Sequence, residues 1–324
     1  MRTAFLAQGL RISVSVLLLA AVLHLTGLLS AEGRSVFIAQ LINADLAWLL
    51  ISLLIGVVIN MSSALKWWWL ARAIGITVGY WRIFCYYVVG QFYNLFLPTS
   101  VGGDVVRAYE LGKYAKQPAA AMASVFVERY TGIVTLFVFA ILAFILQMAI
   151  FNVDFVVVSL VLFAGILGFS AWVVLDPRPY QWVRRFFATR WPRLETLFAK
   201  LDALVTSVDA YRQKPLALFG AFVNSGVFYV LAAINILISA WVFDPSMTWQ
   251  HALAATPIIM LIMNIPISFG NLGLMEFAYA SVFALLGFEP GLGLSVALLM
   301  RFKSVIDGSM GAALQPFFVT RTEN

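Results

Sequence analysis

The sequence predicts an all-α polytopic membrane protein, and three observations point to this class. Of the 324 residues, 62% are hydrophobic and 11% are charged, whereas soluble domains contain about 45–50% apolar and about 25% charged residues. Several apolar runs reach the ~20 residues that a helix needs to cross ~30 Å of hydrocarbon. The sequence has no ~10-residue segments that alternate polar and apolar residues, which disfavours a membrane β-barrel. We expect about six full crossings plus two re-entrant helical hairpins, or about eight crossings, with cytoplasmic N- and C-termini.

The chain begins with a helix that we expect to be retained rather than cleaved. Residues 12–30 are apolar behind a basic start, and no convincing small-x-small cleavage site follows them. A short apolar run at 36–42 is interpreted as an outer interfacial segment, and 47–65 as the next crossing. Lys66 and the tryptophans after it are typical of the cytoplasmic headgroup level. The N-terminus and the end of this crossing are therefore placed on the cytoplasmic side.

The next apolar segment is too short for an ordinary crossing. Residues 83–98 are followed by a basic stretch at 99–118, which a full crossing would carry to the outside. The positive-inside rule favours a re-entrant hairpin from the cytoplasm, which is tolerated where protein or a watery cavity lines it. Two full crossings are the alternative. Residues 119–148 and 155–175 are the crossings expected next.

The longest polar stretch is the loop 176–215. It holds eight basic and four acidic residues, and apolar residues recur at helical spacing in 180–187 and 194–208. The pattern indicates amphipathic helices on the cytoplasmic face, attracted to anionic headgroups. A solvated loop with ordinary positive-inside bias is the alternative.

The second half repeats the organisation of the first half. Its expected segments are a crossing at 216–243, a hairpin formed by 250–265 and 274–287 around a break at 266–273, and a crossing at 291–316. The second hairpin would enter from outside. We therefore predict one transmembrane domain, 1–324, with an inverted repeat of about 47–148 and about 216–318, an architecture that supports alternating access.

Two interruptions of the apolar pattern share one spacing. Pro98, Ser100 and Gly102 fit Pro-x-Ser-x-Gly, and the spacing recurs in 266–270. Broken helices at matching places of two halves are a pointer to a transporter's binding site, although a chance match of loop residues is the alternative. The candidate substrate-binding residues are Asn94, Pro98, Thr99, Ser100, Gly102, Gly103, Asp104, Arg107, Glu128, Arg129, Gly270, Asn271, Glu276 and Arg301.

The predicted helices place two arginines near the bilayer midplane. Arg129 and Arg301 each lie ten residues into a crossing, or ~15 Å along its axis. A charge at that depth costs at least ~2.5–3.5 kcal/mol. We predict that the two arginines meet around a hydrated pocket and bind a lipid phosphate, for which the planar guanidinium is suited. The alternative is that ion pairs with Asp104, Glu128 and Glu276 only fasten the helices together.

Ionisable residues near the site could also couple transport to protons. Lys303 and Asp307 are four residues apart on one predicted helix and are expected to pair. Candidates for ion coupling are Asp104, Glu128, Glu276 and Asp307. Fixed ion pairing is the alternative role for these carboxylates.

The same residues carry a family resemblance that covers essentially the whole chain. The run from Asn94 to Tyr109, the later Glu128–Arg129 pair, and 270–276 with Arg301 resemble the transmembrane region of lysylphosphatidylglycerol synthases and the flippase-like proteins that share it. The resemblance implies movement of a lipid across the bilayer: an aminoacylated phospholipid, a polyprenyl-phosphate-linked sugar or a related amphiphile. It does not imply the synthase reaction, because the soluble catalytic domain of those enzymes is not found in these 324 residues.

The sequence offers few of the motifs and side chains that other classes of function require. Asp-x-Asp, P-loop and Gly-x-Ser-x-Gly motifs are absent from the sequence. One cysteine and two isolated histidines offer little for thiol, acid–base or metal chemistry. We expect no catalytic residue, metal or cofactor; a transferase acting through Asp104 or Glu128, and a non-transporting scaffold, are the alternatives. Expected partners are a membrane lipid substrate and proteins of envelope lipid or glycolipid synthesis, not nucleic acid, and the expected location is the inner cell membrane.

Overall fold

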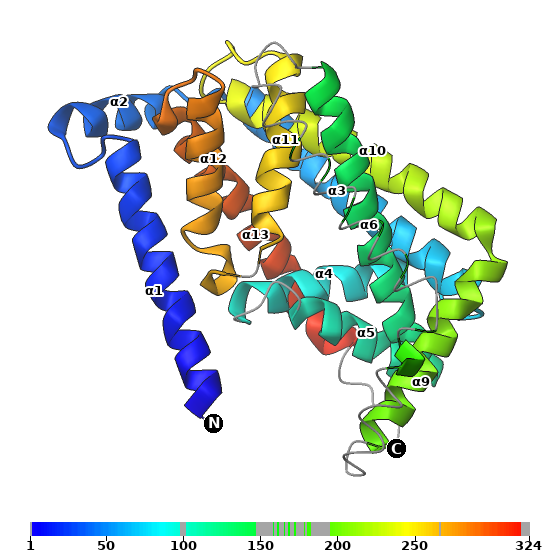
Figure 1. Cartoon of the computed structure of the whole chain (residues 1–324). Helices are drawn as coiled ribbons and strands as arrows, with labels where there is room; N and C mark the ends of the chain where they lie inside the picture. The colour runs from blue at the N-terminus through cyan, green and yellow to red at the C-terminus, as the bar shows by residue number, and fades with distance from the viewer. Residues whose placement is uncertain are drawn as a thin grey trace. The chain divides into compact units, whose positions relative to one another are not determined.

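The computed structural model of the chain describes residues 2–97, 102–146, 195–265 and 267–318, with isolated residues between 158 and 182. Every regular element in these ranges is a helix, as Figure 1 shows. In chain order they are α1 (Arg2–Leu25), α2 (Ala31–Ile42), α3 (Leu46–Ala73), α4 (Tyr80–Phe96), α5 (Gly102–Ala115), α6 (Pro118–Leu146), α9 (Glu195–Asp209), η2 (Ala210–Gln213), α10 (Pro215–Trp241), α11 (Trp249–Met263), η3 (Phe269–Asn271), α12 (Leu274–Leu285) and α13 (Pro290–Phe318).

The helices match the expected segments, and both predicted interruptions separate helices. The largest differences in bounds are at α1, which begins at Arg2 instead of residue 12, and at α3, which continues past residue 65 to Ala73. Trp67 and Leu70 are fully buried, so packing stabilises two more turns of α3. The sequence analysis placed the end of this crossing before these turns because Lys66 and the tryptophans follow residue 65. The helix expected at 194–208 is confirmed as α9. The expected crossing at 155–175 and most of 180–187 lie outside the described residues.

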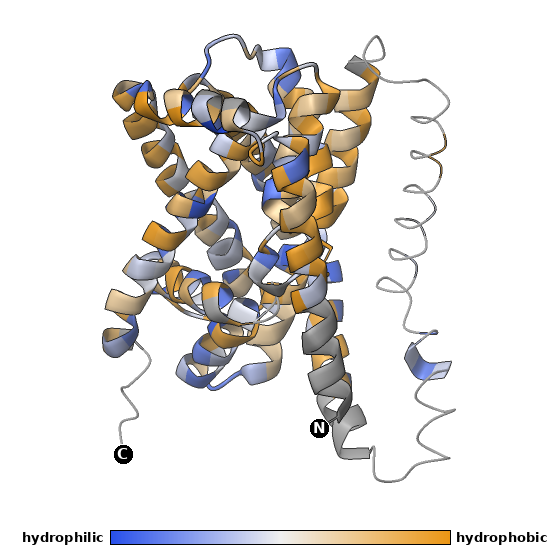
Figure 2. Ribbon diagram, turned by 90° about the vertical axis from the view of Figure 1, so that its left-hand side faces the viewer, coloured by the Kyte–Doolittle hydropathy of each residue, from blue (hydrophilic) through white to orange (hydrophobic). Residues whose placement is uncertain are grey.

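Three of the described helices are long and apolar enough to cross a membrane. They are α3, α6 over Pro118–Ile145, and α10. In the most apolar part of α3 only 17% of residues are buried, and Leu54 is 66% exposed. Figure 2 shows hydrophobic residues along most of the helical ribbon. Such surfaces are suited to lipid and confirm a helical membrane protein, whereas the number of crossings, the re-entrant hairpins and the sidedness of the termini stay predictions.

The described helices group into two compact units. The first comprises Met1–Ser63, Phe84–Arg107 and Gly226–Asn324. Its core lies among α10, α11, α12 and α13, which contribute Ile236, Ile259, Phe283 and Leu292. A Cβ on Gly293 would lie 2.6 Å from the carbonyl oxygen of Tyr279, so glycine allows α12 and α13 to pack backbone against backbone. This unit contains both helix breaks.

The second unit comprises Ala64–Ile83 and Ala108–Ser225. Trp67 of α3 donates from Nε1 to the hydroxyl of Ser124 on α6, over 3.0 Å. Tyr211 of η2 donates to the carbonyl of Leu70, over 2.9 Å. These bonds attach α6 and the segment before α10 to the end of α3. The predicted single domain and inverted repeat stay predictions.

Candidate functional site

The first helix break is closed by a side chain from the helix before it. Asn94, near the end of α4, accepts a hydrogen bond from the backbone N–H of Gly103 over 2.8 Å. A Cβ on Gly103 would collide with the carbonyl oxygen of Gly90, so the start of α5 approaches α4 more closely than any other residue would permit. Pro98, Thr99 and Ser100, which the sequence placed in this break, lie outside the described residues.

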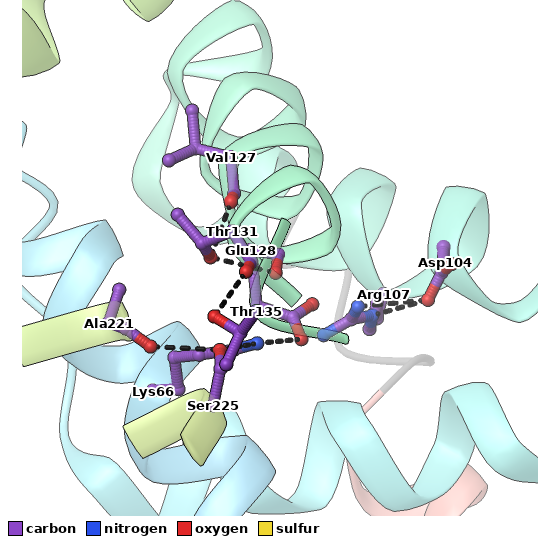
Figure 3. Close-up of polar contacts among 9 residues, drawn as sticks. All are labelled: Lys66, Asp104, Arg107, Val127, Glu128, Thr131, Thr135, Ala221 and Ser225. Carbon is purple, nitrogen blue, oxygen red and sulfur yellow. Dashed lines mark hydrogen bonds and ion pairs between the residues drawn. The ribbon is translucent and has the colours of Figure 1, made fainter. Parts of the chain in front are cut away.

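An ion pair follows directly in the first turns of α5. Asp104 accepts from Nε and Nη2 of Arg107, both at 2.9 Å, as drawn in Figure 3. Both side chains are buried, and the guanidinium also lies over the ring of Tyr87, 5.2 Å from its centroid. A carboxylate in the first turn is further stabilised by the positive end of the helix dipole. The structure therefore confirms one of the pairings that the sequence suggested.

The second break is built from residues with left-handed backbone. Gly270, Asn271 and Gly273 have φ values of 53°, 57° and 77°, a region that favours glycine and tolerates asparagine. A Cβ on Gly273 would lie 2.6 Å from the carbonyl oxygen of Ser15, so α1 packs against this turn. The chain thus reverses between α11 and α12 without continuing either helix.

One carboxylate connects this break to α13. Glu276 accepts from the backbone N–H of Gly273 through Oε2 over 2.8 Å and from Nε of Arg301 through Oε1 over 2.6 Å. Arg301 also donates from Nη2 to the carbonyl of Asn271 over 3.1 Å. The Glu276 side chain is 5% exposed, whereas that of Arg301 is 24% exposed. Among the described residues, none accepts a hydrogen bond from Nη1 of Arg301, so one edge of the guanidinium is open.

The two breaks are neighbours within the first unit. A Cβ on Gly270 would lie 3.8 Å from the carbonyl oxygen of Leu95, at the end of α4. On α13, Gly308 faces the Leu95 side chain and Gly311 faces the Val88 carbonyl closely enough that a Cβ would collide with either. Small residues of α13 therefore bring α4 against it, a role that the sequence reasoning missed although the spacing of the two glycines was visible.

Glu128 and Arg129 lie on α6, in the second unit. Glu128 is buried and faces Lys66 of α3, 3.5 Å from its Nζ. Lys66 also donates to the hydroxyl of Ser225 over 3.0 Å, so it lies between α6 and α10 (Figure 3). Arg129 is exposed. The sequence did not identify Lys66 as the partner of Glu128, and the predicted meeting of Arg129 with Arg301 stays a prediction.

A third polar cluster occupies the interior of the first unit. Lys303 of α13 is buried and donates from Nζ to Asn235 Oδ1 at 2.8 Å and Ser239 Oγ at 2.9 Å, both on α10. Asp307 interacts electrostatically with Lys303 and receives a further contact from Asn60 of α3. The described residues show no ion pair between Lys303 and Asp307, so the expected pairing is not formed, and neutral side chains make the hydrogen bonds to the ammonium. In the part of the chain that the structure describes, no group of three His, Cys, Asp or Glu could hold a metal ion.

Comparison with known proteins shows the family to which the chain belongs. The family model for the lysylphosphatidylglycerol synthase TM region matches residues 9–306. The chain is also 23% identical over 322 residues to a UPF0104 membrane protein of Methanothermobacter thermautotrophicus, and this similarity covers 94% of the chain and 95% of the relative. No solved structure matches the chain.

Proposed function

The chain belongs to the family of the lysylphosphatidylglycerol synthase TM region, and from this premise we propose that it transports lipid across the bilayer. The proposed substrate is an anionic or lipid-linked amphiphile, such as an aminoacylated phospholipid or a polyprenyl-phosphate sugar. Movement would occur by alternating access around the arginine site at the second helix break, in the inner cell membrane. The observation that carries the proposal is the side chain of Arg301, whose guanidinium is anchored at the break although the side chain is 24% exposed.

The lengths of the helices around the break support a hairpin within the membrane. α11 has 15 residues and α12 has 12, which correspond to about 22 Å and about 18 Å of helix. Both are shorter than the ~30 Å hydrocarbon core. Helices of this length can enter the membrane and return, so the break would lie inside it. Non-helical backbone is tolerated at that depth only beside protein or a water-filled cavity.

The contacts of Arg301 support phosphate as the group recognised. Glu276 engages Nε and the Asn271 carbonyl engages Nη2, which fixes the plane of the guanidinium. The remaining edge can donate to a phosphate oxygen, and arginine forms bidentate pairs with phosphate when its donors are free. A lipid phosphate could therefore bind beside Glu276 or exchange with it. The exchange would offer a charged headgroup a partner at a depth where an unpaired charge is costly.

The proposal is tested by reconstituting the purified chain in vesicles with fluorescent phosphatidylglycerol, aminoacylated phosphatidylglycerol or a polyprenyl-phosphate sugar. Dithionite bleaches only the outer leaflet, so translocation is measured as the fraction that becomes accessible, with and without a proton gradient. Arg301→Gln should lower the rate about tenfold or more, because a charge-assisted hydrogen bond contributes about 1.5–3 kcal/mol. Arg34→Gln makes the same charge change in the same unit, on an exposed side chain that donates to the Leu29 carbonyl, and should transport normally.

Three outcomes would contradict lipid transport through this site. Vesicles containing the wild-type chain could behave as protein-free vesicles for all three lipids. This result would favour the alternative that the chain is a non-transporting scaffold. A chemical change of the lipid without translocation would instead indicate a membrane-embedded transferase. An Arg301→Gln variant that transports at the wild-type rate would remove Arg301 from the mechanism.

A further inference from the structure

A pocket in the second unit plays no part in the proposed transport site. It has a volume of about 610 Å³ and lies between the end of α3 and the start of α10. Its lining includes Trp68, Trp69, Arg72, Lys214, Pro215 and Leu216. Ligand sites of proteins commonly have volumes of about 300–1,000 Å³. The pocket is therefore large enough for a headgroup-sized ligand.

The walls of this pocket are held in place by specific contacts. Trp68 donates from Nε1 to the carbonyl of Val78 over 3.0 Å. The guanidinium of Arg72 lies over the Trp68 ring, 4.9 Å from its centroid, a favourable cation–π geometry. The Tyr211–Leu70 hydrogen bond attaches the segment before α10 to α3. The pocket is thus preformed and does not depend on a loop closing over it.

The charge of the pocket favours an anion. Arg72 and Lys214 both line it, and among the described residues no carboxylate does. Within the described residues neither cation forms an ion pair, whereas the nearby Arg212 pairs with Asp209 over 2.9 Å. The 27-residue helix α10 begins at Pro215, so the positive end of its dipole also faces this pocket. The two cations provide partners for a phosphate, and the helix dipole adds to the favourable potential.

The surroundings of the pocket indicate that the phosphate belongs to a lipid. α3 and α10 are two of the helices able to span a membrane, and the pocket lies where one ends and the other begins. Tryptophan, arginine and lysine at such a position are typical of the headgroup level. Leu216, Phe219 and Val223 are 80%, 68% and 52% exposed and lie three and four residues apart, on one face of α10. An acyl chain could follow this apolar face away from the pocket.

We propose that this pocket binds the headgroup of an anionic phospholipid from the leaflet at the cytoplasmic ends of α3 and α10. Arg72 and Lys214 contact the phosphate, Trp68 and Trp69 contact the glycerol region, and an acyl chain lies along the exposed face of α10. The lipid is a bound partner that connects α3 to α10 and is not the transported molecule. The proposal uses different residues from the transport site, so either can fail without the other.

The test measures bound lipid directly. The full chain in detergent is titrated with phosphatidylglycerol, and the number and affinity of retained lipids are read by native mass spectrometry. The double variant Arg72→Gln/Lys214→Gln should lower the affinity of one lipid at least about tenfold, because it removes both charge-assisted hydrogen bonds to the phosphate. Both side chains are exposed, so folding is retained. Arg212→Gln, which removes one positive charge outside the pocket lining, should bind as the wild type does.

Parallel titrations separate a lipid from other ligands. Phosphatidylcholine should bind at least about tenfold more weakly than phosphatidylglycerol, since its ammonium repels the two cations. Leu216→Ser should weaken phosphatidylglycerol without changing the affinity for inorganic phosphate. The proposal is overturned if the double variant retains phosphatidylglycerol as the wild type does, or if phosphatidylcholine binds equally. It is also overturned if millimolar inorganic phosphate displaces the lipid, because the pocket would then hold a free anion.

Discussion

The ion pair between Glu276 and Arg301 makes a quantitative prediction about stability. Glu276→Gln keeps the shape of the side chain and can still accept from the Gly273 N–H, but it leaves the Arg301 charge without its carboxylate, 2.6 Å away in the wild type. Removing one partner of a fully buried pair costs about 3–5 kcal/mol. Because the Arg301 side chain is 24% exposed, water offsets part of this loss, and we expect about 2 kcal/mol.

The assay is thermal unfolding of the purified chain in detergent micelles, with a double-mutant cycle. A loss of about 2 kcal/mol corresponds to a decrease in Tm of roughly 4–8 °C for a domain of this size. Arg301→Gln should also destabilise, and the double variant Glu276→Gln/Arg301→Gln should lose less than the sum of the two single variants. The reasoning is refuted if Glu276→Gln has the same Tm as the wild type, or if the effects of the two single variants on stability are simply additive.

A further variant tests the first break. Gly103→Ala should destabilise by about 1–3 kcal/mol because the added methyl group meets the backbone of α4, whereas Gly56→Ala, with open space around its Cβ, should be neutral or stabilising in the same Tm measurement.

Local features of the sequence were sufficient to predict the helices and both breaks. Apolar runs of different length, interrupted by proline and paired glycines, placed α4, α5, α11 and α12 within a few residues of their observed bounds. The Asp104–Arg107 pair is also local, since residues three apart share a helix face. Gly270 and Gly273 were recognised as a break because glycine alone adopts left-handed backbone without strain.

Contacts between distant segments could not be predicted in the same way. Lys66 resembled a headgroup-level cation, yet its side chain is buried against Glu128 of α6. The hydrogen bond from Lys303 to Asn235 joins residues 68 positions apart. Helical periodicity indicates which face of a helix is polar, but it does not identify the helix that the face will meet. The sequence therefore identified the buried charges that need a partner, but it did not identify most of those partners.

The two ion pairs at the helix breaks differ in a way that bears on their roles. In the Asp104–Arg107 pair both side chains are buried, at 7% and 2% exposure, as expected of a pair that fastens a helix start. In the Glu276–Arg301 pair the glutamate side chain is 5% exposed and the arginine side chain 24%. A purely structural pair gains nothing from leaving its cation open, because exposure weakens the attraction. If the chain transports lipid as proposed, the edge of Arg301 beside the break that contacts the end of α4 would bind the headgroup phosphate, and the buried pair at the first break would hold the neighbouring helix in position.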